Sequence, residues 1–385
     1  MIKKIVKLQI HKMVLGVCLI PTIHVLAQDA TTDSNFKLSG YISVVGGKVL
    51  SGKLDANYTG FDALKGVTCP CYIADWGNAG VYGNSFSFTP ESRMGLQGQY
   101  IFNSQANVTA QLVSRGTHET PDLAWAYGSY KFNNFLEVQV GRKRIPLYYY
   151  SDFQDIGVAY TWIAPPPELY GWEATNYNGA SLRYTLGLGD TDLTASVFGG
   201  KEKVSDSLYH ALWSSGETEV QWNNIKGVDL EVVHGPITVR AVAMRADVRT
   251  INPTELLDEP AVLSAHGLAV NLDFDKWFVL SEFTELTRDI ADQDNPYKVT
   301  APAWTVGAGL RMGKWTPFIN VAQFTEETTD TSLYDPTSYK RTSFTLRYDI
   351  SSTSAVKAQI DRHDDITNNF SGDVTVFRLS YDRVF

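Results

Sequence analysis

FKLSGYISV, residues 36–44, alternates between apolar or small side chains and mainly polar ones without a break. Successive side chains of a β-strand point to opposite faces, so this segment predicts a strand with one apolar and one polar face. One parity holds Phe36, Leu38, Gly40, Ile42 and Val44, and the other holds Lys37, Ser39, Tyr41 and Ser43.

The same alternation recurs along the rest of the chain. A chain with 47 aromatic residues, 30 Gly and only 5 Met is also β-rich in composition. With the first segment, the alternation predicts sixteen strands. The other fifteen lie near 85–102, 107–115, 122–131, 136–144, 178–186, 192–199, 226–233, 237–245, 266–273, 277–284, 303–312, 316–324, 341–350, 355–363 and 374–385.

The connections between these segments alternate between short turns and mostly longer loops. A transmembrane β-barrel has short periplasmic turns and longer outer loops, whereas a soluble sandwich has no reason for this asymmetry. The seven turns are 103–104, 133–134, 187–190, 235–236, 273–276, 313–314 and 351–352. The eight loops are 47–84, 116–121, 145–177, 200–225, 246–265, 285–302, 325–340 and 364–373.

Any one alternating segment could equally be a half-buried strand of a soluble protein. Strand after strand, however, the polar parity contains Gln, Asn, Thr, Arg and Asp. A soluble barrel of this size would have to bury that face or expose the apolar one to water. We therefore expect an all-β fold: a transmembrane antiparallel β-barrel of about 16 strands, with lipid outside and water inside.

The first 27 residues have the layout of a cleavable secretory signal, with four lysines, an apolar run and a small residue before the expected cleavage site. We expect residues 1–27 to be the signal peptide and 28–385 to be one barrel domain. Removal of the signal leaves 29 basic and 42 acidic residues. An exported chain this acidic is a poor candidate for binding nucleic acid.

Enzyme and metal-site motifs are not evident in the sequence. The histidines after residue 27 lack the paired spacing of a zinc site, and there is no nucleophile elbow or phosphate-binding Gly loop. We expect no catalytic residue, no cofactor and no metal. Cys69 and Cys71 lie in the first long loop, and an oxidising compartment would favour a disulfide between them, although the sequence leaves their pairing open.

Two stretches resemble the general porins of the Gram-negative outer membrane. FRLSYDRVF, residues 377–385, resembles their carboxy-terminal assembly signal, with Tyr381 and Phe385 as its aromatics and Arg383 as a departure from the usual pattern. GRKRIPLYYYSDFQDIGVAYTWIAPPPELYG, residues 141–171, resembles a block of the same family. The resemblance implies a homotrimer, recognition by the barrel-assembly machinery, and a third outer loop that folds into the pore.

The predicted third outer loop, 145–177, is the candidate pore constriction. Arginine on the lipid face would cost about 2–4 kcal/mol near the membrane centre, so the cations on polar parity are expected to line the lumen. Acids on one side of a constriction and cations on the other would create a transverse field that favours small hydrophilic solutes. The predicted constriction residues are Asp152, Asp155, Glu168 and Glu173 of the loop and Arg93, Arg115, Lys143 and Arg183 of the wall.

Three functions remain open from the sequence. The first is an outer-membrane porin for passive diffusion, in contact with outer-membrane lipid and lipopolysaccharide. The second is a substrate-selective channel of the same fold, and the third is a surface barrel without a channel, acting as an adhesin or structural protein. The sequence does not decide between cation and anion preference, since an acidic chain and a lumen rich in arginine argue in opposite directions.

Overall fold

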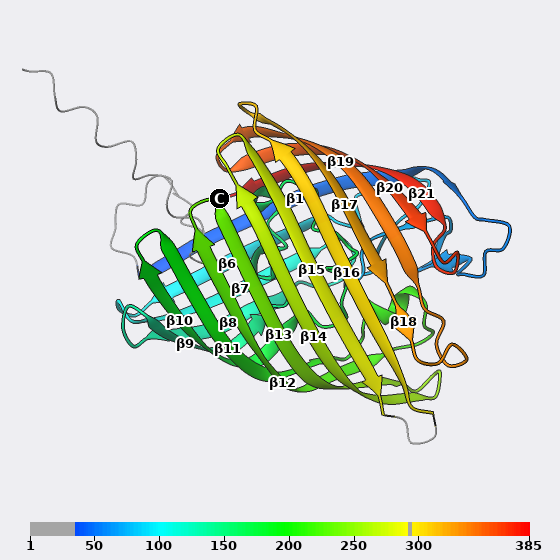
Figure 1. Ribbon diagram of the computed structural model, residues 1–385, viewed down its shortest axis with the longest axis horizontal. Coiled ribbons are helices and arrows are strands. Elements are labelled where there is room, and N and C mark those ends of the chain that lie inside the picture. Colours follow the sequence, from blue (N-terminus) through cyan, green and yellow to red (C-terminus); the bar gives the residue numbers. More distant parts are fainter. Residues whose placement is uncertain (1–34, 292–294) are drawn as a thin grey trace, which may run out of the picture.

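The computed structural model describes residues 35–291 and 295–385, so the predicted signal peptide, 1–27, lies outside the described residues. The described chain forms a closed antiparallel β-barrel of sixteen strands (Figure 1). The strands are β1 (Phe36–Lys53), β6 (Arg93–Ile101), β7 (Ala106–Arg115), β8 (Asp122–Lys131), β9 (Leu136–Arg144), β10 (Asn176–Leu188), β11 (Thr191–Val204), β12 (Glu219–His234), β13 (Ile237–Asn252), β14 (Leu257–Asp273), β15 (Trp277–Ile290), β16 (Tyr297–Leu310), β17 (Trp315–Thr325), β19 (Ser338–Ser351), β20 (Ser354–Asp365) and β21 (Asp373–Val384).

The barrel closes where β1 lies between β21 and β6. Gly40 and Phe385 exchange backbone hydrogen bonds of 2.8 and 2.9 Å, so pairing continues to the last residue. A side chain on Gly40 would overlap the ring of Phe385, which lies across this glycine. Tyr381 pairs with Val44 on one side and Val356 on the other. Among the described residues, closure thus pairs the first strand with the last, as a barrel that spans a membrane requires.

The outward face of the strands carries the apolar parity, as the alternation predicts. Exposed apolar side chains on it include Leu38, Met94, Leu112, Val140, Leu182, Val197, Val228, Leu268, Phe283, Val306, Ile319, Phe344, Ile360 and Leu379. Near the short turns this band ends in aromatic residues, among them Phe102, Phe132, Phe135, Phe274, Trp277 and Trp315. Aromatic girdles at membrane interfaces have this position. No helix among the described residues is long and apolar enough to cross a membrane.

Short turns join the strands at one end of the barrel, here called the turn end, and most longer connections lie at the other, the loop end. The loops contain four short strands, β2 (Ala63–Leu64), β3 (Val67–Thr68), β4 (Tyr72–Asp75) and β5 (Gly80–Tyr82), and three 3-10 helices, η1 (Ser151–Phe153), η2 (Gly157–Ala159) and η3 (His210–Leu212). One further short strand, β18 (Glu327–Thr328), pairs with β16 beyond the end of β17.

The predicted loops 246–265 and 285–302 are wrong, because most of both ranges is strand. β13 continues to Asn252 and β14 begins at Leu257. In β13 the apolar residues change from the outer to the inner face. Outward residues are apolar up to Ala243. Beyond it, Arg245 and Asp247 face outward, and Ala246 is fully buried inside. The wall therefore rises above the apolar band, and its inner face there packs in a hydrophobic cluster.

Candidate functional site

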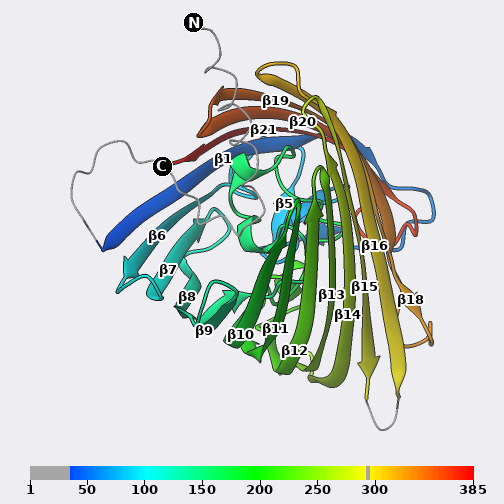
Figure 2. The same cartoon turned by 60° about the vertical axis from the view of Figure 1, so that its left-hand side comes forward.

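The segment between β9 and β10, residues 145–175, folds into the barrel and is called the inner loop (Figure 2). Wall strands around the barrel hold its backbone. Arg240 of β13 donates to the carbonyls of Pro146 and Tyr148, each at 2.9 Å. On the other side of the barrel, Lys357 of β20 donates to the Gly157 carbonyl at 2.6 Å. The loop is therefore fixed across the lumen.

Asp155 is the most heavily paired acid of the inner loop. Its carboxylate makes a two-point contact with Arg115, at 2.6 and 2.9 Å, and a further ion pair with Arg144. The Arg93 Nε donates to the Asp155 carbonyl at 2.9 Å. Burial by itself would raise the pKa of Asp155, but the charges of Arg115 and Arg144 outweigh it and hold the pKa well below its usual value. The Asp155 side chain is therefore a charged anchor for the loop.

Glu168 belongs to a chain of buried ion pairs at the other side of the loop. Its carboxylate accepts from the Arg341 Nε at 3.0 Å, and Arg341 also pairs with Asp361 at 2.9 Å. Asp361 in turn pairs with Arg378 at 2.8 Å, and Arg378 with Glu91 at 2.7 Å. All five side chains are at most 1% exposed. Removing one partner of such a buried pair typically costs about 3–5 kcal/mol, so the network fixes the loop firmly.

Glu173, near the end of the inner loop, is fully buried and bound from two strands. The Arg288 guanidinium of β15 pairs with its carboxylate at 2.6 Å, and the Trp222 indole of β12 donates to it at 3.1 Å. His210 of η3 lies 3.8 Å from the same carboxylate. Glu173 therefore joins the inner loop to the wall and to the loop 205–218.

Asp152, Lys143 and Arg183 form a looser group toward β8–β12. No ion pair within 4 Å involves these three side chains in the described chain. Asp152 is half-buried and acts electrostatically on Lys143. Lys143 donates to Ser181 at 3.2 Å, and the Arg183 Nε has no hydrogen-bond partner in the described structure. This sector has the predicted charges but not the direct pairing seen at Asp155.

The eight predicted constriction residues thus fall into two arrangements. The expectation of acids facing cations across a gap does not hold for Asp155, Glu168 and Glu173, because each contacts an arginine directly. The predicted cations Arg93 and Arg115 both lie at Asp155. Lys143 and Arg183 remain in the looser group with Asp152.

The sequence did not identify several side chains that hold the inner loop or its network. Glu282 of β15 accepts from the Tyr149 amide at 2.8 Å and from the Tyr170 hydroxyl at 2.6 Å, which holds the loop at both its ends. Arg341 lies on the polar parity of its strand, with Ser343 and Thr345, so alternation could have identified it. Nothing in the local sequence marks Glu91, which reaches Arg378 across 287 residues.

Arg142 and Arg144 share the parity of Val140, which is exposed on the outer face of β9, but local geometry keeps them off the lipid face. Gly141 precedes them with φ of 139°, a backbone conformation that other residues rarely adopt. Arg144 pairs with Asp155 inside the barrel, and Arg142 pairs with Glu202 at 2.7 Å. Both guanidinium groups are therefore neutralised by carboxylates.

At the loop end, aromatic side chains from four segments pack together and form what we call the outer cap. Trp76 stacks on Tyr339 with 5.7 Å between ring centroids and lies 5.0 Å from Phe370. Tyr209 and Trp213 of the loop 205–218 pack on the same tryptophan. The cap joins the segments 54–92 and 366–372 and covers the loop side of the barrel interior.

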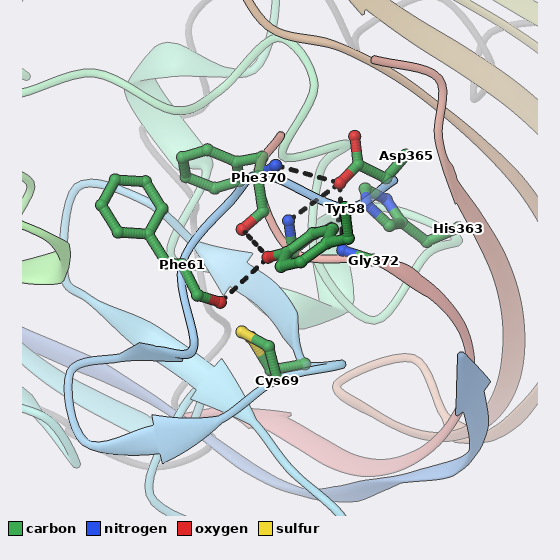
Figure 3. Close-up of a disulfide and its surroundings, with 9 residues drawn as sticks. Tyr58, Phe61, Cys69, His363, Asp365, Phe370 and Gly372 are labelled. Carbon is green, nitrogen blue, oxygen red and sulfur yellow. Dashed lines mark hydrogen bonds between the residues drawn. A yellow bond between two sulfur atoms is a disulfide. The ribbon is translucent and has the colours of Figure 1, made fainter. Parts of the chain in front are cut away.

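Figure 3 shows how the segments 54–92 and 366–372 are tied together. The Tyr58 hydroxyl donates to the carbonyls of Phe61 and Phe370 at 2.9 and 2.8 Å. Three successive amides, those of 370–372, donate to one oxygen of Asp365 at 3.0 Å each. A disulfide joins Cys69 to Cys71 beside this contact, the pairing that an oxidising compartment favours. Within 35–291 and 295–385, no group of His, Cys, Asp and Glu could hold a metal ion.

No family model matches the sequence, and no curated protein is similar to it. Solved structures do match. The outer membrane channel DcaP of Acinetobacter baumannii is 11% identical with a TM-score of 0.60, covering 91% of this chain and 97% of that chain. OmpT of Vibrio cholerae in its trimer form, an outer membrane protein, is 10% identical with a TM-score of 0.57, covering 91% and 99%.

A third match is the anion-selective porin from Comamonas acidovorans, 12% identical with a TM-score of 0.56, covering 91% of this chain and 99% of that one. These likenesses extend over nearly the full length of every chain compared. At such low identity they establish architecture, not the details of a site. The chain therefore has the fold of the Gram-negative outer-membrane porins, a closed antiparallel barrel of sixteen strands.

Proposed function

We propose that the protein is an outer-membrane porin through which small hydrophilic solutes diffuse passively. The observation that carries this proposal is the inner loop, which crosses the lumen. Arg115 of β7 holds it at Asp155, and Glu282 of β15, on the opposite side of the barrel, holds it at Tyr149 and Tyr170. A loop held inside a barrel by charged contacts narrows the passage without needing to move. The channel is the space that this loop leaves beside the wall.

The lumen below the inner loop supports a water-filled passage. Inward side chains there are polar or charged and partly exposed, which suits an aqueous lining and not a packed core. They include Gln97, Gln99, Glu137, Arg183 and Glu231. With Asp152 and Lys143 nearby, solutes in this sector would meet both signs of charge.

The proposed setting is the outer membrane, reached by means of the signal 1–27 and with loops outward. The apolar band supports this location, and the solved structures of the same fold are described as outer membrane proteins. One of these relatives is described as a trimer, which supports a homotrimer here. Tyr381 and Phe385 would carry the signal read by the assembly machinery. The proposed role is non-enzymatic and uses no cofactor.

A substrate-selective channel is the second candidate, and the outer cap favours it. The cap places Trp76, Tyr339 and Phe370 over the loop end, where a wide diffusion pore would be open. These three rings are buried against one another, so the cap narrows the entrance, and a narrow entrance selects solutes by size and shape. A selective channel would then show block by one solute class, whereas a general porin would not.

Reconstitution in planar bilayers separates these functions. Purified protein is added to the bilayer, and single-channel conductance is recorded alone and with sugars, dicarboxylates and phosphate compounds. Stepwise conductance without solute block supports a general porin, and block by one class supports the selective channel. Protein that inserts and gives no conductance steps would overturn both and leave the non-channel barrel.

A further inference from the structure

The sequence contains three triplets in which an asparagine is followed, after one residue other than proline, by serine or threonine. They are Asn57-Tyr58-Thr59, Asn107-Val108-Thr109 and Asn369-Phe370-Ser371. Such a triplet is the acceptor of N-linked glycans in exported proteins, where it lies in a surface loop. An acid two positions before the asparagine strengthens the site in bacteria, because it can pair with a cation of the transferase. Only the first triplet has such an acid, Asp55.

Asn57 lies at the tip of a turn at the loop end. The Tyr58 amide donates to the Asp55 carbonyl at 3.0 Å and closes this turn. The Tyr58 hydroxyl donates to the Phe370 carbonyl at 2.8 Å, so the base of the turn is fixed to the outer cap (Figure 3). The side chains of Asn57 and Thr59 are exposed, and in the described part of the chain neither has a hydrogen-bond partner. The amide that would accept a sugar and the hydroxyl that a transferase recognises are therefore both free.

The upstream acid is available to a cation of the transferase. The Asp55 side chain is 43% exposed, and its ion-pair partner is Lys53 at 3.1 Å. An exposed ion pair of this kind contributes little to stability, so the exchange of Lys53 for another cation costs little. The three residues that define the acceptor site, Asp55, Asn57 and Thr59, thus all face solvent.

The other two triplets are committed to contacts within the fold. Thr109 of β7 is 4% exposed, and its hydroxyl accepts from a side-chain amide at 3.3 Å. Asn107 shares its inward face, so a glycan there would stand inside the barrel. In the third triplet, the Asn369 side-chain amide donates to the Pro336 carbonyl at 3.1 Å, and Ser371 is 2% exposed. A glycan at either position would therefore conflict with the folded structure.

We propose that Asn57 carries an N-linked oligosaccharide at the outer surface. A transferase joins the Asn57 Nδ2 to the anomeric carbon of an oligosaccharide held on a lipid pyrophosphate. The bond between that carbon and the pyrophosphate oxygen breaks, the lipid pyrophosphate leaves, and the amide loses one proton to a base of the transferase. The reaction needs no oxidant or reductant.

The setting rests on the proposed function, which places the loop end outside the outer membrane. Transfer then takes place in the periplasm, before the barrel is inserted. The folded structure decides which modified chains can still assemble, and a glycan at Asn57 extends from its turn into solvent. The inference therefore requires export of the chain but does not depend on conduction.

The test is peptide mass spectrometry on the protein isolated from its own outer membrane. Trypsin places the three triplets in separate peptides, 54–65, 94–115 and 363–378. The variants are Asn57→Gln, which removes the acceptor, Thr59→Val and Thr59→Ser, which remove or keep the hydroxyl, and Asp55→Asn. Asn369→Gln is the matched control, since it removes a triplet of the same cap that lacks the upstream acid. Gel mobility before and after heating verifies that each variant is folded.

We expect peptide 54–65 of the wild type to carry the mass of an oligosaccharide, fragmentation to place it on Asn57, and the other two peptides to be unmodified. Asn57→Gln and Thr59→Val should abolish the modification. Thr59→Ser and Asn369→Gln should keep it, and Asp55→Asn should lower its occupancy at least tenfold. An unmodified peptide 54–65 in the wild type would overturn the proposal, and so would a sugar on Thr59 or equal occupancy in Asp55→Asn. Conductance is measured separately, so failure here leaves the channel proposal standing.

Discussion

The Arg115 guanidinium holds the Asp155 carboxylate at two points, Nη1 to Oδ1 at 2.6 Å and Nη2 to Oδ2 at 2.9 Å. This contact joins the end of β7 to the middle of the inner loop, 40 residues later in the chain. Arg93 and Arg144 contact the same aspartate, so three guanidinium groups surround one carboxylate. The site fixes the loop and leaves an excess of positive charge at one edge of the lumen.

Asp155→Asn should shift the reversal potential in a salt gradient toward anions. The substitution leaves three guanidinium groups without their carboxylate, and in a narrow space their field is weakly screened. The double change Arg93→Gln with Arg115→Gln should shift it in the opposite direction. Both shifts should shrink at 1 M salt, where the Debye length is about 3 Å.

Asp258→Asn provides the control for this charge change. Asp258 is also paired with an arginine, Arg249, but its side chain is half exposed on the outer face of the wall. Its substitution should leave the reversal potential unchanged. An equal shift in the two aspartate variants would mean that Asp155 does not face the conducting path.

Phe385→Ser should lower the yield of assembled barrel. The residue exchanges backbone hydrogen bonds with Gly40 at the closing seam, and its ring covers that glycine. Leu256→Ser is the matched control, since Leu256 is an exposed apolar residue in a hairpin away from the seam. Heat-modifiable protein in outer-membrane fractions is the measurement, and equal yields would count against a role of the terminal aromatic.

Asp365→Ala should loosen the outer cap and raise conductance. One oxygen of Asp365 accepts from the amides of 370–372, and a buried amide left without a partner costs about 1–3 kcal/mol. Asp364→Ala is the neighbouring control, because Asp364 is half exposed and pairs only with Arg362 at 2.7 Å in the described structure. Identical single-channel records for the two variants would show that the cap does not limit flow.

Acidification should loosen the loop 205–218 through His210. Burial lowers the pKa of His210, and the nearby Arg288 lowers it further, while Glu173 and Glu255 act in the opposite sense. Below about pH 6.5 the unfolded loop therefore binds a proton that the folded loop does not, so stability falls as pH falls. Opening of this loop, measured as hydrogen exchange relative to the intrinsic exchange rate at each pH, should rise between pH 7 and pH 5, and His210→Gln should flatten that rise. A rise of the same size in His210→Gln would exclude the histidine as its source.

Alternation along the chain was enough to predict the fold. Strands such as 36–44 have lipid on one face and water on the other, so the polarity of each residue indicates the face on which it lies. The sixteen strands and the fold class are confirmed. The prediction failed at 246–265, where lipid gives way to solvent outside and packed side chains replace water inside. At that height the outward residues are polar and the inward ones apolar. A search for strands with apolar outward residues therefore assigns the segment to a loop.

The ion pairs of the site were beyond the reach of sequence alone. The alternation places Arg115 and Arg93 in the lumen, but which acid each one meets depends on the path of the inner loop. Glu168 and Arg341 are 173 residues apart, and no local pattern connects them. Acids that were expected to face a gap prove to be anchors, because a loop this apolar and aromatic fills the space in which the gap was expected.

The most direct test of the account is the single-channel conductance of a variant that lacks residues 150–170, compared with one that lacks the exposed residues 331–333. The first deletion removes most of the inner loop, and the second shortens a loop outside the lumen. If the inner loop sets the width of the passage, conductance should rise several-fold in the first variant and stay at the wild-type value in the second. Wild-type conductance in both, with both barrels folded, would contradict the account.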